Sequence, residues 1–304
     1  MVQVSVAGAS GNLGSRIVAS LQARGASVVA IVRTGKTSST TFPPTVKVVE
    51  ADYASVSSLR DAVRGSQVVV SALQGLRPVI VETQSRLLQA AAEESVPRFI
   101  PSDYAIDFTT FGPGRNRNLD LRREFWQQID EQPNIRATSI LPGAFAFTLT
   151  MPWFVDVAQA KVLYWGDNAD VAIDYSSLDN VADYTALAAL DDDAPRYLRV
   201  ASTTQTPTTL AVALSRLTGR QFTTKREGSL DEIRGKIATL LQQDPSPGDN
   251  LRPYWQALQF AENISSGFGG TKTHDNDRYG SQVKWATIEE VLAPFKSAFL
   301  ARAG

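Results

Sequence analysis

A glycine turn near the start of the chain constrains its fold more than any other feature. Residues 2–6 have the alternating β-branched character of a buried strand. A helical spacing of apolar residues begins at Ile17. Between strand and helix, glycine recurs at every third position, as Gly8, Gly11 and Gly14. A strand that passes into a helix through such a turn predicts the first unit of a parallel α/β sheet.

Each glycine of this turn meets a different steric demand of a bound pyrophosphate. Gly8 permits a tight turn, Gly11 lets the backbone approach the anion, and Gly14 allows close packing of helix on strand. The N–H groups of the first helical turn then face the phosphates. A plain strand–helix turn is the alternative, but it explains only one or two of the glycines. The predicted dinucleotide cradle consists of Gly8, Ala9, Ser10, Gly11, Asn12, Leu13 and Gly14.

The end of the second predicted strand, residues 27–32, indicates which dinucleotide fits. Arg33 follows this strand directly, and Lys36 lies close behind it. An acidic residue at this place favours a free ribose 2′-hydroxyl, whereas a guanidinium and a second cation suit a 2′-phosphate. A solvated basic turn is the alternative. We therefore expect NADP(H) rather than NAD as the cofactor.

The carboxyl ends of the later strands supply the other expected cofactor contacts. Alternating strands and helices with short connections predict a parallel sheet, and such sheets bind ligands at the carboxyl ends of their strands. Asp52 and Tyr53 follow a strand at 46–50 and are expected beside the adenine. The exit of the strand at 67–71, which begins with Ala72 and Leu73, is expected beneath the pyrophosphate and the nicotinamide ribose. Ser102, after the next strand, is a further expected cofactor contact.

Composition excludes several classes of function. The 304 residues include 30 basic and 31 acidic side chains, so charge gives no reason to expect a nucleic acid or an anionic membrane as partner. Cysteine is absent and His274 is the single histidine, so we expect no disulfide, no thiolate chemistry and no metal site. No leader precedes the first strand, and no apolar run approaches the ~20 residues that cross a bilayer. We expect a cytoplasmic protein.

Length and pattern predict two domains. Residues 1–150 are expected to form a Rossmann-type, doubly wound parallel sheet of the α/β class, to which residues 171–203 return. Residues 151–170 and 204–304 are expected to form a smaller, mostly helical substrate-binding or lid domain. Within the first domain, the pattern predicts a helix over Asn116–Gln132 and then one strand over Ile135–Leu141.

The first two-thirds of the chain resembles the atypical short-chain dehydrogenase/reductase group that includes NmrA-like regulators and isoflavone reductase-like enzymes. Besides the glycine turn and Arg33, the segment Arg98–Tyr104 is similar to the Arg-Phe-x-Pro-Ser-Glu-Phe-Gly signature of the isoflavone reductase branch. The turn Trp165–Asn168 and the later Asp179–Ala182 also match. The resemblance implies an NADPH-binding Rossmann domain, a C-terminal domain that closes over the substrate, Arg33 at the 2′-phosphate and Phe145 beside the nicotinamide.

One departure from this family affects the chemistry. Enzymes of the isoflavone reductase branch carry a lysine that acts as acid, base or polariser, and the matching position here is Arg122. No lysine occurs between Lys47 and Lys161. An arginine does not exchange its proton near neutral pH, although it can stabilise an oxyanion beside the nicotinamide. The Tyr-x-x-x-Lys pair of ordinary short-chain enzymes is absent as well.

Tyr104 and Asp103 are the best-placed candidates to supply a proton. A phenol can donate if a nearby cation such as Arg122 lowers its pKa. In the alternative, Tyr104 forms a pocket wall in place of the phenylalanine of the family, and Asp103 caps a turn. The candidate catalytic residues are therefore Tyr104, Arg122 and Asp103.

Two features of the C-terminal half leave alternatives open. His274 lies in a loop rich in glycine and aspartate, where it either reaches a pocket when the loop closes or is a solvated surface residue. Four aromatic residues either stack against an aromatic substrate or form core. They are Trp153, Phe154, Tyr164 and Trp165.

Two functions from different classes are consistent with the sequence. The first is an NADPH-dependent reductase of an aromatic, quinone-like or phenylpropanoid-type small molecule. The second is a non-catalytic sensor of NADP(H) that acts through a protein partner, which Arg122 in place of lysine favours. Self-association into a homodimer is left open.

Overall fold

A computed structural model describes residues 1–35, 41–244 and 250–300. The chain divides into two compact units. The first consists of Met1–Tyr104, Asp120–Ile140 and Leu178–Leu198, and the second of Ala105–Leu119, Leu141–Ser177 and Arg199–Gly304. Among the described residues, no helix combines the length and the apolar character needed to cross a membrane.

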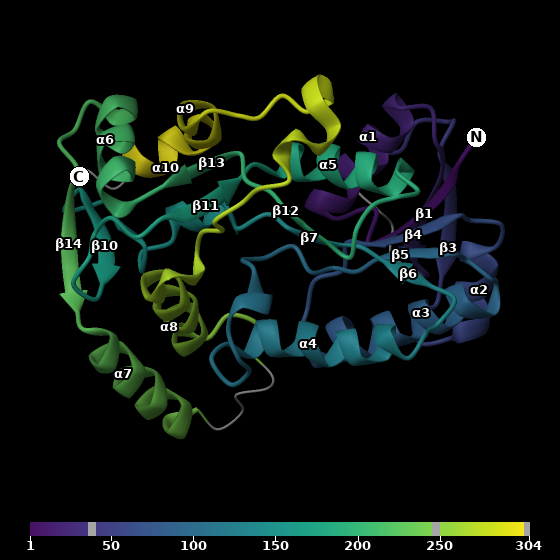
Figure 1. The fold of residues 1–304 in the computed structure, drawn as a ribbon, viewed down its shortest axis with the longest axis horizontal. Helices are drawn as coiled ribbons and strands as arrows, with labels where there is room; N and C mark the ends of the chain where they lie inside the picture. Colours follow the sequence, from purple (N-terminus) through teal and green to yellow (C-terminus); the bar gives the residue numbers. More distant parts are fainter. Residues whose placement is uncertain (36–40, 245–249, 301–304) are drawn as a thin grey trace. The chain divides into compact units, whose positions relative to one another are not determined.

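The first unit is built on a six-stranded parallel sheet with the order β3-β2-β1-β4-β5-β6 (Figure 1). Its strands are β1 (Gln3–Ala7), β2 (Ser27–Arg33), β3 (Lys47–Ala51), β4 (Val68–Ser71), β5 (Arg98–Ile100) and β6 (Arg136–Ala137). The chain moves outward from β1 to β3 and then returns to the other side of β1 at β4. The loops after β1 and β4 therefore diverge at a topological switch point, where such sheets bind ligands.

Helices cover both faces of this sheet. They are α1 (Asn12–Ala23), α2 (Val56–Val63), the π-helical turn η1 (Pro78–Thr83), α3 (Gln84–Glu93), α4 (Arg117–Asp130) and α5 (Leu178–Leu190). Helices α1 and α5 pack together on one face. Helices α2, α3 and α4 lie on the other face (Figure 1). Leu59 of α2, Leu87 of α3 and Phe125 of α4 belong to one apolar core. The predicted Rossmann-type, doubly wound fold is confirmed.

The single strand predicted over Ile135–Leu141 is wrong in its extent. Strand β6 pairs with β5, and the N–H of Thr138 still donates to Phe99 O at 3.0 Å. The next strand, β7 (Ser139–Leu141), pairs instead with β12 (Tyr197–Arg199). The run of β-branched and apolar residues predicts extended backbone correctly, but the choice of partner strand depends on residues far away in sequence.

The second unit contains two small sheets. One has the order β13-β11-β8, and the other has the order β14-β10-β9. Their strands are β8 (Ala144–Phe145), β9 (Val155–Asp156), β10 (Lys161–Trp165), β11 (Ile173–Ser176), β13 (Thr203–Gln205) and β14 (Thr223–Gly228). In the first sheet β8 is parallel to β11, with Ala144 opposite Tyr175 and Phe145 opposite Ser176.

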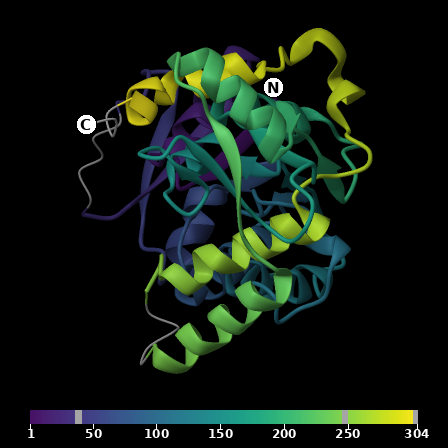
Figure 2. The same cartoon turned by 90° about the vertical axis from the view of Figure 1, so that its left-hand side faces the viewer.

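Helices make up most of the rest of this unit. They are η2 (Phe108–Thr110), η3 (Ala146–Thr150), α6 (Pro207–Thr218), α7 (Leu230–Gln243), α8 (Tyr254–Asn263), η4 (Ile264–Phe268), η5 (Asn276–Gln282), α9 (Ile288–Leu292), η6 (Ala293–Phe295) and α10 (Lys296–Leu300). Helices α7 and α8 lie side by side (Figure 2). Ile233 of α7 and Leu258 of α8 belong to one apolar cluster. A larger core joins Leu210 of α6 to strands β10 and β11.

Candidate functional site

The glycine turn after β1 leaves no room for side chains at two of its three glycines. Gly8 has φ +74°, and a Cβ added there would lie 2.8 Å from Ala72 O. A Cβ at Gly14 would lie 2.1 Å from Gly8 O. Gly11 is less restricted, with 3.1 Å between its added Cβ and Gly8 O. The turn and the close packing of helix on strand therefore require glycine at positions 8 and 14.

The N-terminus of helix α1 is exposed to solvent and has no side-chain cap at Gly11. The helix begins at Asn12, after Gly11 in extended conformation, and its first turn contains no acidic residue. The N–H of Gly11 donates to Gly8 O at 2.9 Å, which closes the turn. Ser10, Gly11 and Asn12 are exposed, whereas Ala9 is buried and Leu13 is half-buried. The first-turn amides and the helix dipole thus offer positive potential to an anion.

Tyr53, which follows β3, stabilises the glycine turn through its hydroxyl. Its hydroxyl accepts a hydrogen bond from the N–H of Gly8 at 3.2 Å and donates one to Ile31 O at 3.1 Å. The hydroxyl therefore links the ends of β1 and β2. This role was not predicted, because sequence pattern places Tyr53 only near the adenine and does not show where its hydroxyl points.

Of the two residues predicted to bind the 2′-phosphate, the structure describes Arg33. Arg33 is the last residue of β2 and is exposed. In register it lies opposite Ala51, so Asp52 follows on the next strand at the same edge. The Asp52 carboxylate accepts from the N–H of Ala54 at 2.9 Å, which caps the turn before α2. Lys36 lies outside the described residues.

Ser102 ties together the ends of β4 and β5. Its hydroxyl donates to Leu73 O at 2.6 Å, and its N–H donates to Oε1 of the buried Gln84 at 3.0 Å. The N–H of Ala72 donates to Ala7 O at 2.9 Å. Ala72, Leu73 and Ser102 therefore lie together at the carboxyl edge of the sheet. Gln84 was not among the predicted site residues, although a glutamine on the buried face of a helix signals such a bond.

Asp103 is fully buried, with 0% of its surface exposed. The Trp126 indole N–H donates to Asp103 Oδ2 at 2.7 Å, and Arg122 Nε donates to the backbone oxygen of Asp103 at 3.1 Å. Burial raises the pKa of the Asp103 carboxyl, while the neighbouring Trp126 and Arg122 partly oppose that rise. The residue thus binds helix α4 to the end of β5.

Tyr104 is not activated in the way that the sequence suggests. Burial raises its pKa, and the nearby Asp103 carboxyl acts in the same direction, whereas a proton donor needs a lowered pKa. Burial also lowers the pKa of Arg122, with Asp103 opposing the fall. An arginine nonetheless keeps its charge at neutral pH. Tyr104 is thus a buried phenol that keeps its proton, and Arg122 is a fixed positive charge.

Phe145 belongs to the second unit, where it lies on one face of the β13-β11-β8 sheet. Its ring stacks on Phe147 at 5.9 Å between centroids. Its neighbour Ala144 packs against the apolar core together with Tyr175, the residue opposite it on β11. Because side chains alternate along strands, Phe145 projects from the other face of the sheet.

The same face carries an Asp–His pair. Asp174 on β11 is 1% exposed, and its Oδ2 lies 2.9 Å from His274 Nε2. The side chain of His274 is 25% exposed. The histidine is therefore held by a buried carboxylate rather than fully solvated. Sequence reasoning could not pair these residues, which are 100 positions apart.

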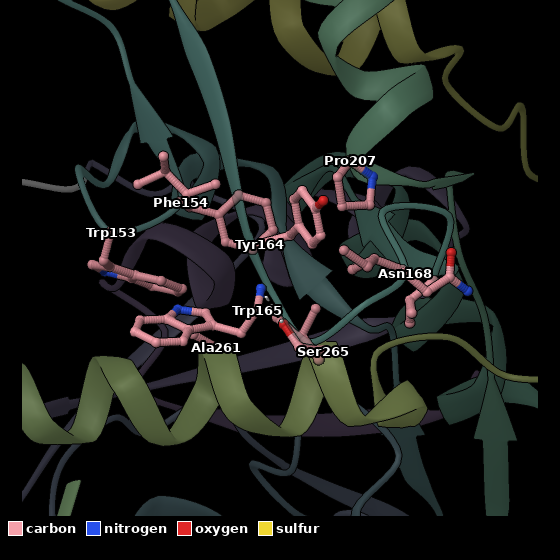
Figure 3. A pocket seen from close by; sticks show the side chains of 12 residues that line it. Trp153, Phe154, Tyr164, Trp165, Asn168, Pro207, Ala261 and Ser265 are labelled. Carbon is pink, nitrogen blue, oxygen red and sulfur yellow. Dashed lines mark hydrogen bonds between the residues drawn. The ribbon is translucent and has the colours of Figure 1, made fainter. Parts of the chain in front are cut away.

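The four aromatic residues singled out from the sequence meet at one pocket (Figure 3). Phe154 and Trp165 are nevertheless only 4% and 9% exposed and pack in the apolar core. Ile173 also lines the pocket, so the pocket lies on the core face of the β13-β11-β8 sheet, opposite Phe145. The arrangement favours the core interpretation of these aromatic residues.

Acidic and histidine side chains do not gather into a metal-binding group within the described ranges. The groups that remain for chemistry are the glycine turn, the Arg122–Asp103 pair and the Asp174–His274 pair.

Comparison with known proteins identifies relatives along most of the chain. Oxidoreductase swnN of Metarhizium robertsii is 28% identical over 294 residues, covering 83% of this chain and 85% of the relative. The isoflavone reductase homolog IRL of Zea mays is 27% identical over 319 residues, covering 96% and 98%. The solved structure of AtPrR2 with NADP+ and (+)pinoresinol has a TM-score of 0.74 at 21% identity, covering 97% of this chain and 98% of that chain.

The family model described as the NmrA-like family matches residues 2–229. This span contains the glycine turn, the six-stranded sheet and the strands described for the second unit. The likeness to AtPrR2 extends the shared fold over the helical C-terminal region. The match over more than half of its length confirms the resemblance read from the sequence: this chain belongs to the NmrA-like family.

Proposed function

We propose that this protein is an NADP(H)-dependent reductase that delivers hydride to an aromatic, quinone-like or phenylpropanoid-type small molecule. The observation that carries the proposal is the glycine turn, where a Cβ at Gly14 would lie 2.1 Å from Gly8 O beside the exposed N-terminus of α1. A helix start without acidic side chains next to so close a backbone approach fits a pyrophosphate.

In this proposal the first unit holds the cofactor. The amides of Asn12 and Leu13 bind the pyrophosphate, and Arg33 with Lys36 binds the ribose 2′-phosphate. Asp52 borders the adenosine, and the edge formed by Ala72, Leu73 and Ser102 lies along the nicotinamide ribose. The exposed guanidinium at the end of β2 supports NADP(H) over NAD. The structurally similar AtPrR2 was solved with NADP+, which supports the same cofactor.

The second unit then binds the substrate, with Phe145 beside the nicotinamide. The substrate class rests on the relatives, whose names include an isoflavone reductase homolog and a protein solved with pinoresinol. When bound, a reduced nicotinamide supplies the hydride. Arg122 contributes a permanent positive charge that stabilises an oxyanion developing on the substrate. Asp103 holds that guanidinium in place through its backbone oxygen.

Calorimetry and a turnover assay test the proposal. We expect the purified protein to bind NADPH more tightly than NADH. We also expect it to oxidise NADPH saturably with at least one member of a panel of quinones, aromatic carbonyls and conjugated enones, followed at the nicotinamide absorbance band. Tight binding without turnover on any panel member would identify a non-catalytic NADP(H) sensor instead. The absence of binding heat with both nucleotides would refute the cofactor assignment altogether.

A further inference from the structure

We propose that His274, oriented by Asp174, is the proton donor of the proposed reduction and takes the place of the missing lysine. The inference deepens the proposed function and rests on it. Hydride addition to a carbonyl or a conjugated enone also requires a proton, and Arg122 cannot release one at neutral pH. His274 is the single histidine of the chain, and imidazole is the side chain best suited to release a proton near neutrality.

The carboxylate of Asp174 is built to fix an imidazole. Its Oδ1 accepts from Thr204 Oγ1 at 2.6 Å. Its Oδ2 accepts from the N–H and the hydroxyl of Thr271 at 2.8 and 3.1 Å, and lies 2.9 Å from His274 Nε2. A buried carboxylate with these donors on both oxygens cannot turn away, so it sets the orientation of the ring. Nε2 is directed at Asp174, so Nδ1 is the ring nitrogen that we assign to the substrate.

The pair lies on the same face of the β13-β11-β8 sheet as Phe145, the residue that we propose beside the nicotinamide. Ile173 and Tyr175 of β11 point into the apolar core, so Asp174 between them projects from the opposite face. Phe145 projects from this face as well, because it follows core-facing Ala144 on the parallel strand β8.

Strands β8 and β11 approach each other closely where Gly143 lies beside Asp174. A Cβ added at Gly143 would lie 2.6 Å from the Cβ of Asp174, and Gly143 has φ +71°. The residue that precedes Ala144 therefore has to be glycine, because Asp174 occupies the space of its side chain. Through Asp174, His274 is therefore tied to the strand that lies next to the segment containing Phe145.

The hydride and its electron pair form a new C–H bond at the carbonyl carbon, or at the far carbon of the enone, and the displaced π electrons move to the oxygen. Protonated His274 donates its Nδ1 proton to that oxygen, which forms the O–H bond of the alcohol or enol. The imidazole becomes neutral and regains a proton from solvent, which its 25% exposed side chain allows. Asp174 holds the ring in place throughout by its contact with Nε2.

A purely structural role for His274 is the competing explanation, since the bond to Asp174 also ties the loop after Gly270 to β11. The chain offers a matched control for that role. Asn276, two residues further on, anchors the same loop through its side chain, which donates to Ala201 O at 2.8 Å and accepts from Ala201 N–H at 3.1 Å. Asn276 has no bond to the Asp174–His274 pair among these contacts, so Asn276→Ala loosens the loop without removing the acid.

The experiment uses the full chain and the panel substrate that it turns over fastest. For His274→Gln, whose amide can still donate to Asp174, we expect kcat to fall about 100-fold or more while NADPH affinity stays unchanged. The solvent deuterium isotope effect on kcat should rise as proton transfer becomes limiting. Added imidazole should restore part of the turnover of His274→Ala. For Asn276→Ala, kcat and its isotope effect should stay close to those of the unmodified protein.

Three outcomes overturn the inference. If His274→Gln keeps both kcat and the isotope effect, another group supplies the proton and the reductase assignment stands. If His274→Gln and Asn276→Ala lose equal activity and imidazole restores none, the histidine only anchors the loop. If the unmodified protein binds no NADPH, the proposed function fails first and the inference fails with it, which the binding assay shows separately.

Discussion

The hydroxyl of Tyr53 accepts a hydrogen bond from the backbone N–H of Gly8 at 3.2 Å and so connects the third strand region to the first residue of the glycine turn. The same oxygen donates to Ile31 O at 3.1 Å. Burial raises the pKa of Tyr53 to about 12, with the Gly8 N–H and the Arg33 charge opposing. The phenol therefore keeps its proton, and both bonds persist across the physiological pH range.

Tyr53→Phe should weaken cofactor binding because it leaves the Gly8 N–H and the Ile31 carbonyl without this partner. We expect a loss of about 1–2 kcal/mol in the free energy of unfolding and a roughly fivefold weaker affinity for NADPH. Thermal unfolding and calorimetry measure the two effects. Tyr254→Phe is the matched control, since Tyr254 is 52% exposed and far from the turn in sequence. Equal affinities for the Tyr53 and Tyr254 variants would show that Tyr53 does not shape the cradle.

Gly14→Ala should abolish NADPH binding and destabilise the fold by about 3 kcal/mol, because its Cβ would collide with backbone that cannot move away. The collision is with Gly8 O, 2.1 Å from the added atom. Gly235→Ala in α7 meets nothing within 4 Å and should instead stabilise the protein by about 0.5–1 kcal/mol. Urea unfolding compares the two variants. A Gly14→Ala protein with normal stability and affinity would contradict the close approach of helix and turn.

Arg33→Asp should exchange the cofactor preference. A charge-assisted bond to the 2′-phosphate contributes about 1.5–3 kcal/mol, so NADPH affinity should fall roughly 10- to 100-fold. NADH affinity should hardly change, because NADH has no phosphate at that position. Calorimetry with both nucleotides checks this, and Arg216→Asp, with a side chain that is 73% exposed, controls for the change in net charge. If NADPH affinity survived the change, the assignment of Arg33 would be wrong.

Asp103→Asn should change how stability depends on pH. Burial raises the pKa of Asp103 in the folded state, so this group stabilises the fold below its ordinary value of about 4, and that contribution is lost as pH rises through the raised value. The amide is neutral at every pH and its oxygen can still accept from the Trp126 indole. The stability of Asp103→Asn relative to the unmodified protein should therefore increase with pH. Urea unfolding at a series of pH values measures this, and a constant difference would show that the carboxyl is not destabilised by burial.

Local sequence specified the backbone of the first unit almost completely. Glycine spacing required the turn after β1, and the alternation of strands and helices predicted the parallel sheet and its helices. These features depend on residues within a few positions of each other, so a single sequence reveals them. The carboxyl-edge residues Ala72, Leu73 and Ser102 could be predicted for the same reason, since the end of each strand is visible in the pattern.

Only the tertiary structure decided which distant groups meet. The run Ile135–Leu141 is extended as predicted. Its first part pairs with β5 and its last part pairs with β12, and the local sequence pattern does not specify this choice of partner strands. Likewise His274 acquires its buried carboxylate from a strand 100 positions earlier, and the Tyr53 hydroxyl is directed at Gly8 rather than at a ligand. Backbone conformation follows from short-range sterics and periodicity, whereas pairing between distant residues depends on how the whole core packs. The sequence therefore determined the nucleotide cradle, and folding determined the Asp–His pair to which we assign the proton.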